Sequence, residues 1–322
     1  MAETREPRKA EVRIGAVGVH VPAHREANRP RLAELTVNED LIDNKLGIEY
    51  RAVKAPSQSI VDLCISAYAD LCAHGVIELS AIQLCCVVTQ NPDQPVPHVS
   101  ALLHHQLGLA KSCLTFDISQ ACAGYVYGLT LATALMERLG LEQALLFTCD
   151  PYSKIVDPTD RNTALIFGDA ATVTHLTRAG AGYAFIDGDY GTVPGSSACL
   201  RTEGEPPTLH MDGIAVLMNA VREVPGSIRT VLARHTWSLT DVDLVLLHPG
   251  SLRVVDLLRR KLDLSEDKAP FEIARIGNTV SSSIPLSLQR HIREPRHNRI
   301  VMSGFGVGFS WATCVLERRS GT

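Results

Sequence analysis

The sequence lacks the features that mark several classes of protein. No segment of its 322 residues approaches the roughly 20 continuous apolar residues of a membrane-spanning helix. The polar first ten residues lead into a strand-like run without the apolar stretch of a signal peptide. No block of Lys or Arg dominates, and the net charge is only −4, so nucleic acid is not indicated as a partner. We therefore expect a soluble, cytoplasmic protein that neither binds nucleic acid nor enters a membrane.

The nine cysteines form neither a metal-binding nor a disulfide pattern. Their number is odd, and no two stand in a C-x-x-C arrangement, which is typical of a reduced intracellular protein. His104, His105 and His210 have no ligand-like residues beside them in the sequence. The "GAVG" run at Gly15 lacks the rest of a dinucleotide-binding fingerprint. We therefore expect no metal site and no resident cofactor.

Strand-like runs alternate with segments of helical spacing along the whole chain. Apolar residues make up 45% of it and charged residues 20%, as in an ordinary globular protein. The alternation predicts an α/β protein with buried, largely parallel sheets. The expected strands are 12–21, 82–90, 144–150, 164–176, 241–250 and two closing strands within 299–317. The expected helices are 60–75, 101–109, 122–137, 218–237 with a break near Pro225, and 251–264.

The second half of the chain repeats the order of elements in the first half. The strands at 82–90 and 242–250 hold matching places, each preceded by a long helix. No low-complexity linker separates the halves. We therefore expect one unit over 1–322, with an N-terminal half at 12–178 and a C-terminal half at 179–322.

Cys122 stands where the strand-like run "FDIS" gives way to an almost unbroken apolar helix. A helix this apolar should be central and covered on all sides. A thiol at its N-terminus should have a lowered pKa, because free N–H groups and the helix dipole stabilise the thiolate. Gly124 and two alanines leave room for a substrate. Most buried cysteines simply pack, as we expect for Cys64, Cys72 and Cys314, but its position makes Cys122 a candidate nucleophile.

Two polar residues hold similar places further along the chain. His248 follows directly on an expected strand and precedes a helix, which makes it a candidate base or hydrogen-bond donor. Asn278 lies in a glycine-tipped turn before a helix, where most asparagines serve only the backbone. Each residue alone is weak evidence. Three such residues, each at the mouth of a strand, together indicate a catalytic site.

The order and spacing of several motifs resemble the β-ketoacyl-acyl-carrier-protein synthase III group of the thiolase superfamily. The likeness runs from about Val12 to Glu317 and is carried by "LGIEYRAVKAP", "FDISQACAGYVYG", "DPTDRNTALIFGDAA", the histidine after "DLVLL", "GNTVSSSIPLSL" and "FGVGFSWATCVL". The resemblance implies the thiolase fold, a duplicated five-layered αβαβα sandwich. It also implies a homodimer.

For the site, the resemblance implies that Cys122 takes an acyl group from a thioester and holds it as an acyl-enzyme. His248 and Asn278 would bind the thioester carbonyl of a malonyl-type extender and stabilise the enolate formed as carbon dioxide leaves. That carbanion would then attack the acyl-cysteine. Backbone N–H groups of Cys122 and Val307 would form a second oxyanion hole, although the family commonly has glycine where this chain has Val307.

The substrate channel departs from the pattern of the housekeeping enzymes. Leu41 stands where the family has a tryptophan that stacks on the adenine of coenzyme A, whereas Arg161 keeps the other adenine-contacting position. Ile214 and Leu217 replace an asparagine and a phenylalanine, and Val96 stands where the partner subunit offers the acyl pocket a residue that is often aromatic. The motif "HPGS" replaces "HQAN" and is similar to the "HPGG" of chalcone-synthase-like enzymes. These changes imply a reshaped tunnel, a weaker hold on coenzyme A, and a specialised polyketide or fatty-acid-derived pathway.

The helix after His248 carries three residues that match the positions facing the acidic acyl carrier protein in the family. They are Arg253, Arg260 and Lys261. Charges on a solvated helix often have no partner, but the resemblance implies that acyl carrier protein docks here. No cofactor is implied beyond the coenzyme A or phosphopantetheine arm of the substrate.

Three other functions stay open. A related enzyme would move the acyl group to oxygen or nitrogen, or join two carrier-bound chains; Asn278 beside His248 favours carbon–carbon bond formation. A silent partner subunit would tend to lose the cysteine that this chain keeps. A cysteine hydrolase would also present Cys, His and Asn in this order, but "C-G-x-C-W" is missing. The acyl chain, its carrier and any cyclisation of the product depend on tunnel shape rather than on these motifs.

Overall fold

Nine strands form one hydrogen-bonded series in the computed structural model, which describes residues 11–73, 75 and 77–321. Their order across the series is β11-β12-β13-β8-β1-β7-β6-β4-β5. The strands are β1 (Arg13–His20), β4 (Leu84–Val88), β5 (Leu114–Ile118), β6 (Gln143–Cys149), β7 (Ala171–Thr177), β8 (Gly182–Thr192), β11 (Leu244–Leu247), β12 (Arg299–Gly306) and β13 (Ser310–Arg319).

The series consists of two half-sheets that meet at a narrow seam. Strands β1 and β8 pair only at Arg13 with Ala184 and at Ile14 with Tyr183. The chain crosses from one half-sheet to the other between Thr177 and Gly182. The division of the chain into two halves at 178/179 stays a prediction.

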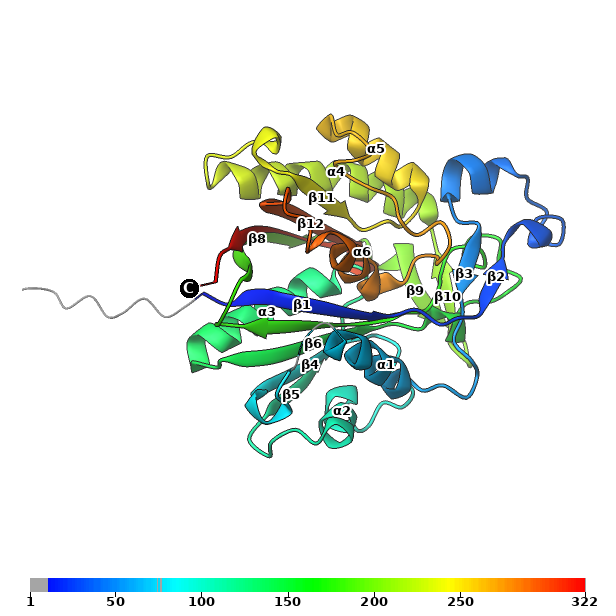
Figure 1. Cartoon of the computed structure of the whole chain (residues 1–322). Coiled ribbons are helices and arrows are strands. Elements are labelled where there is room, and N and C mark those ends of the chain that lie inside the picture. Colours follow the sequence, from blue (N-terminus) through cyan, green and yellow to red (C-terminus); the bar gives the residue numbers. More distant parts are fainter. Residues whose placement is uncertain (1–10, 74, 76, 322) are drawn as a thin grey trace, which may run out of the picture.

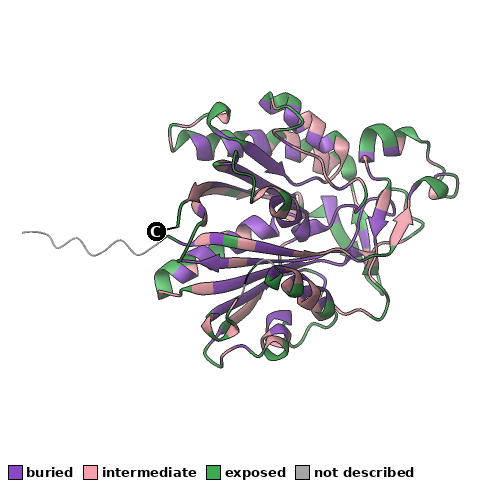
Figure 2. Cartoon of the chain, in the orientation of Figure 1, coloured by how far each residue is buried: buried purple, intermediate pink, exposed green. Residues whose placement is uncertain are grey.

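In the described part of the chain, six α-helices lie on and between the half-sheets. They are α1 (Ile60–Cys72), α2 (Val99–Leu107), α3 (Gly124–Leu139), α4 (Gly213–Ala233), α5 (Leu252–Leu262) and α6 (Ser283–His291). Helices α3 and α6 contact strands of both half-sheets, whereas α1 and α2 cover one outer face. On the other outer face α4 packs on β8, β12 and β13, and α5 packs on α4 (Figure 1). Buried strands are enclosed between helices that expose their outer sides (Figure 2). The expected αβαβα sandwich is confirmed.

The direction of the strands differs from the expectation of largely parallel sheets. Strand β4 runs parallel to β5 and β6, and β11 runs parallel to β12, but the other neighbouring pairs are antiparallel. The short connection from β12 to β13 suits an antiparallel pair, since a parallel pair needs a long crossover. The other antiparallel pairs join strands that are further apart in the chain, and the alternation of strands and helices does not reveal which of these strands become neighbours.

Two helices also differ from the sequence-based expectation. Helix α4 continues through Pro225 instead of breaking there. A proline costs one helical hydrogen bond, but Val224, Pro225 and Ile228 are buried on the face that packs on the half-sheet, and this packing holds the helix together. Helix α3 is not covered on all sides, because its second half reaches the surface and exposes Leu131 and Leu139.

Several short elements were not predicted. The expected strand at 164–176 begins only at Ala171, and Phe167 instead makes an isolated bridge to Asn278. The small strands are β2 (Arg25–Ala27), β3 (Tyr50–Ala52), β9 (Leu200–Glu203) and β10 (Thr208–Met211). A π-helical turn spans Leu41–Leu46, and 3₁₀ turns span Arg29–Arg31, Leu79–Ala81, Tyr152–Lys154, Ser197–Cys199, Leu239–Asp241, Val280–Ser282 and Val307–Phe309. Within the described ranges, no helix is both long and apolar enough to cross a membrane.

Candidate active site

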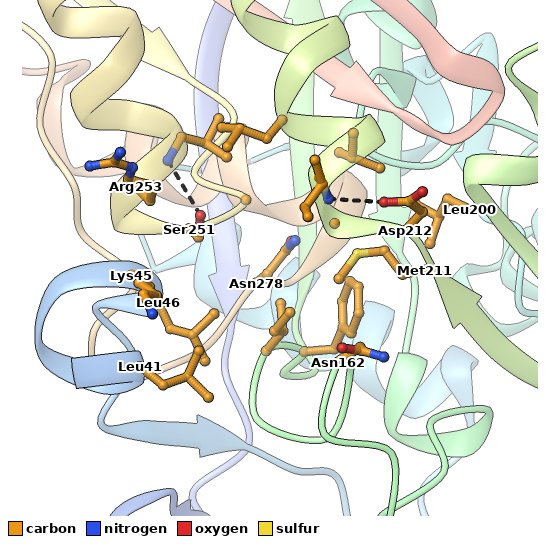
Figure 3. A pocket seen from close by; sticks show the side chains of 18 of the residues that line it. Leu41, Lys45, Leu46, Asn162, Leu200, Met211, Asp212, Ser251, Arg253 and Asn278 are labelled. Atoms are coloured by element: carbon orange, nitrogen blue, oxygen red, sulfur yellow. Dashed lines mark hydrogen bonds between the residues drawn. The ribbon is translucent and has the colours of Figure 1, made fainter. Parts of the chain in front are cut away.

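A cavity of about 1220 Å³ opens between the π-helical turn, the start of α4 and the start of α5 (Figure 3). Cys122, His248 and Asn278 all line it. Cys122 precedes α3, His248 follows β11, and Asn278 precedes the 3₁₀ turn Val280–Ser282. The structure therefore brings the three predicted catalytic residues into one cavity.

Cys122 lies two residues before α3, between the end of β5 and the passing strand β12. A side-chain Cβ on Gly306 would come within 2.9 Å of Cys122 Cβ and 3.1 Å of its Sγ. A Cβ on Gly304 would come within 2.5 Å of the Cys122 carbonyl oxygen. Glycine is therefore needed at both positions of β12, because the strand runs directly against the turn that holds the thiol.

The structure corrects the expected direction of the Cys122 pKa. Burial raises the pKa of this thiol, the nearby carboxyl group of Asp150 raises it further, and the Cys122 backbone N–H opposes the rise. A charge at a helix N-terminus gains about 0.3–1 kcal/mol, less than one pKa unit in most cases. Full burial shifts a pKa by up to about 3–5 units. The free enzyme therefore holds Cys122 as the neutral thiol.

Asp150 is a buried carboxyl group at the end of β6 that sequence reasoning missed. Its Oδ1 accepts a hydrogen bond of 2.7 Å from the backbone N–H of Gln90, and its Oδ2 accepts one of 2.5 Å from the hydroxyl of Ser281. Burial raises the pKa of Asp150 to about 6, against these hydrogen bonds. Asp150 thereby ties the ends of two strands to the segment that follows Asn278.

His248 is buried immediately after β11. Its backbone N–H donates to the carbonyl of Ser303 at 2.8 Å, and its ring meets the edge of Phe305 with centroids 5.7 Å apart and an interplanar angle of 90°. Burial lowers the pKa of His248 to about 3, so the imidazole is neutral at pH 7. Among the described residues, no group hydrogen-bonds to its Nδ1.

Asn278 is fixed by its backbone and by one side of its amide. Its N–H donates to Ile166 at 2.8 Å, and its carbonyl accepts from Gly168 at 3.0 Å. The side-chain Oδ1 accepts a hydrogen bond of 2.9 Å from the N–H of Val280. The amide oxygen is thus occupied by the backbone, and the amide nitrogen points into the cavity (Figure 3).

The residues predicted to bind substrate divide into two groups. Leu41, Arg161, Ile214 and Leu217 line the cavity, with Leu41 on the π-helical turn and Ile214 on the first turn of α4, 76% exposed. Val96 does not line the cavity of the described chain; it lies on a surface loop and is 78% exposed. A role for Val96 in the acyl pocket of a partner stays a prediction.

The positively charged residues predicted on α5 lie in two different places. Arg253 lines the cavity, whereas Arg260 and Lys261 lie exposed in the last turn of the helix. Val307 begins the turn Val307–Phe309 after β12, and its side chain packs on the buried cluster that includes Cys122. The oxyanion-hole role of Val307 stays a prediction.

Further cavity residues were not predicted, for a physical reason. Phe305 and Gly306 are the last residues of β12 and were visible as part of a glycine-rich motif, but only the fold shows that they face His248 and Cys122. Lys45 and Arg201 line the cavity among other surface charges, and the sequence carries no signal that separates them.

Two family models match this chain. The model for 3-oxoacyl-[acyl-carrier-protein] synthase III matches residues 116–194, and the model for the C-terminal part of that enzyme matches residues 232–318. The β-ketoacyl-[acyl-carrier-protein] synthase III of Geobacillus kaustophilus is 31% identical over 308 residues, which cover 94% of this chain and 98% of that protein. The chain belongs to the β-ketoacyl-[acyl-carrier-protein] synthase III family.

Other relatives and solved structures support the same family assignment. The synthase III of Neisseria meningitidis serogroup B is 30% identical over 317 residues, covering 95% of this chain and 98% of that protein. The synthase III structure from Pseudomonas aeruginosa superposes with a TM-score of 0.88 at 29% identity, covering 97% of this chain and 99% of that one. The priming β-ketosynthase of the R1128 polyketide pathway also gives 0.88, at 25% identity over the full length of both chains. The protein is thus a condensing enzyme of the acyltransferase class with the thiolase fold.

Proposed function

We propose that this synthase III family member is acylated on Cys122 by an acyl thioester. It then joins the acyl group to a malonyl- or β-ketoacyl-type thioester through a new carbon–carbon bond. The observation that carries the proposal is one cavity that is lined by a buried thiol, a neutral imidazole and an amide nitrogen.

In the first step the Sγ of Cys122 bonds to the acyl carbonyl carbon, and the bond from that carbon to the donor sulfur breaks. The proton of the Cys122 thiol passes to the departing thiolate. Burial raises the pKa of Cys122, so the proton stays on the enzyme until a donor is bound. A neutral thiol in a buried site limits side reactions of the resting enzyme.

In the second step His248 and Asn278 act on the extender. A histidine whose pKa burial lowers to about 3 is a poor base, but as a neutral imidazole it donates one hydrogen bond. Together with the Asn278 amide it stabilises an enolate oxygen. Loss of carbon dioxide creates that enolate without any base. The site therefore favours decarboxylation of a malonyl-type extender over removal of a proton from a β-ketoacyl chain.

The departures at the cavity mouth support a specialised pathway. Leu41 leaves no aromatic ring on the π-helical turn to stack on adenine, and Ile214 and Leu217 make the start of α4 apolar. The similarity to a priming β-ketosynthase of a polyketide pathway points the same way. We infer that the enzyme serves polyketide or fatty-acid-derived synthesis with acyl carrier protein as its partner. We infer that it works as a homodimer on substrates held by coenzyme A or phosphopantetheine.

Intact-protein mass spectrometry tests the acylation step. Wild type and Cys122→Ala are mixed with acyl thioesters, each offered on coenzyme A and on a carrier protein. We expect the mass of one acyl group on wild type and none on Cys122→Ala. No gain with any donor would contradict the proposal and would indicate a silent partner subunit.

The His248→Ala and Asn278→Ala variants test the second step separately. Both keep Cys122, so we expect both to accept an acyl group. On addition of a malonyl thioester, the acyl mass should leave wild type but persist on both variants. Equal discharge from all three proteins would show that the two residues do not act on the extender.

A further inference from the structure

Asn278 is held by a tight turn in which its own side chain takes part. The side-chain Oδ1 accepts a hydrogen bond of 2.9 Å from the N–H of Val280, two residues further on, which is the pattern of an Asx turn. The hydroxyl of Ser283 donates to the same oxygen at 3.4 Å. Because these groups hold the amide oxygen, the turn decides where the amide nitrogen points.

The turn contains a residue in an unfavourable backbone conformation. Val280 has a φ of 56°, in the left-handed region that a β-branched residue rarely adopts. Its side chain is fully buried, in the cluster that includes Cys122. A strained conformation of this kind persists only where the surrounding structure holds it. The contacts next to Val280 must therefore fix the chain.

Ser281, which follows Val280 directly, is anchored to a buried carboxyl group. Its hydroxyl donates to Asp150 Oδ2 at 2.5 Å, a length typical of a hydrogen bond to an ionised carboxylate. The start of α3 lies against it, since a Cβ on Gly124 would be 3.8 Å from the Ser281 Cβ. Ser281 is only 1% exposed. It is thus fixed both by a strong hydrogen bond and by packing.

Asp150 is itself held at the ends of two neighbouring strands. It follows directly on β6, and its Oδ1 accepts from the backbone N–H of Gln90 at 2.7 Å, two residues beyond β4. Strands β4 and β6 pair along their length, and Asp150 is fully buried. The rigid end of the half-sheet is therefore connected, through Asp150 and Ser281, to the turn that orients Asn278.

We propose that Ser281 is a positioning residue for the extender step. Its hydrogen bond to Asp150 holds the turn that aims the Asn278 amide nitrogen into the cavity (Figure 3). This inference rests on the proposed role of Asn278 in stabilising the enolate. Without the Ser281 hydroxyl, Val280 can relax to a negative φ, and its N–H then turns away from Asn278 Oδ1. The released amide rotates and no longer presents its nitrogen to the extender.

Single-turnover discharge of the acyl-enzyme tests the proposal. Wild type, Ser281→Ala and Asn278→Ala are acylated with acetyl- or octanoyl-coenzyme A, and a saturating malonyl thioester is added on coenzyme A or on a carrier protein. The acyl mass on the intact protein gives the rate of each step. We expect Ser281→Ala to be acylated within about threefold of the wild-type rate but discharged at least about tenfold more slowly. Asn278→Ala should be discharged at least as slowly as Ser281→Ala.

Val280→Gly provides a readout that a merely structural role of Ser281 would not change. Glycine adopts a positive φ without strain, so the turn should hold without its anchor. Added to Val280→Gly, Ser281→Ala should therefore slow discharge by less than about threefold, against at least about tenfold when Val280 is present.

Ser227→Ala is the matched control for the loss of a buried serine hydroxyl. Ser227 lies on α4, and its hydroxyl donates to Thr313 at 2.9 Å, with no link to the Asn278 turn. We expect both steps to keep their wild-type rates in this variant. Thermal unfolding curves of all variants show how far each loss affects folding.

The outcomes are distinguishable. If Ser281→Ala is discharged as fast as wild type, or slows discharge equally with and without Val280→Gly, the inference is overturned. If Val280→Gly does not fold, Ser281→Ala and Ser227→Ala still decide, because only Ser281→Ala should lose discharge while it keeps acylation. If no donor acylates wild type, or if Asn278→Ala is discharged as fast as wild type, the proposed function itself fails and the inference fails with it.

Discussion

At Cys122 two effects of opposite sign act on one thiol. The start of α3 stabilises a negative charge there, while burial and the carboxyl group of Asp150 destabilise it. Because desolvation is the larger effect in a buried site, the thiol stays protonated in the free enzyme. We therefore expect the thiol of Cys122, the proposed nucleophile, to react slowly in the free enzyme.

This balance predicts slow alkylation of the free enzyme. At pH 7, we expect iodoacetamide to modify Cys122 at least about tenfold more slowly than the exposed Cys72. The rate at Cys122 should rise with pH, because deprotonation becomes less costly. Peptide mapping of the alkylated protein gives both rates in one sample. Faster modification of Cys122 than of Cys72 at pH 7 would contradict the account.

Asp150 allows a second test of how its surroundings set the pKa of Cys122. Burial raises the pKa of Asp150 to about 6, so above that pH the carboxylate is charged and raises the pKa of Cys122. Asp150→Asn removes the charge and should speed alkylation of Cys122 above pH 6. Below about pH 5 the wild-type carboxyl is mostly neutral, and the variant and wild type should react alike. A uniform change at all pH values would indicate altered packing instead.

At the scale of the element, β12 approaches the Cys122 turn so closely that only glycine fits. Gly306→Ala places a methyl group about 3 Å from Cys122 Sγ and should slow acylation at least about tenfold, because small displacements of reacting groups are costly. Gly226→Ala is the matched control, since Gly226 lies exposed inside α4 with open space around its Cα. It should stabilise the protein by about 0.5–1 kcal/mol and leave acylation unchanged.

Acylation rates and urea unfolding of both glycine variants check this prediction. Unchanged acylation in Gly306→Ala would show that β12 can move away from the Cys122 turn. The close approach of β12 to Cys122 would then not be needed for acylation.

The elements also show which features the sequence could reveal. Cys122, His248 and Asn278 were predictable because each stands where a buried strand or glycine turn meets a helix, a local pattern. Asp150 was not, because its place in the site depends on a segment distant in sequence, the one that carries the hydroxyl of Ser281. The direction of the Cys122 pKa was wrong for the same reason. The helix terminus is visible in the sequence, but the burial that outweighs it is not.

The predictions of strand direction and of a break in α4 were wrong for a related reason. The alternation of strands and helices suggested largely parallel sheets, but most neighbouring pairs are antiparallel and join strands that are distant in the chain, such as β1 with β7 and β8 with β13. Pro225 suggested a break in α4, but packing on the half-sheet keeps the helix continuous. In both cases tertiary contacts decided what local pattern left undetermined.

At the scale of the whole molecule, the cavity and the far end of α5 offer separate contacts to a carrier. Arg253 lines the cavity and would act on any donor, whereas Arg260 and Lys261 lie outside it. The double variant Arg260→Glu/Lys261→Glu should therefore raise the KM for a carrier-protein donor by about fivefold to tenfold. The KM for the matching coenzyme A donor should stay unchanged.

Arg138→Glu, an exposed reversal at the end of α3, is the control for net charge. It should affect neither donor. An equal loss with both donors in the double variant would show that Arg260 and Lys261 do not contribute to docking.

The most direct test of the whole account follows the acyl group after it reaches Cys122. Wild-type protein carrying one acyl group is mixed with a malonyl thioester, and the acyl mass, carbon dioxide and product are measured together. We predict that the acyl mass leaves Cys122 as an equal amount of carbon dioxide is released and a β-ketoacyl thioester forms. Discharge to water or to an oxygen or nitrogen acceptor, with the malonyl thioester unchanged, would contradict the account.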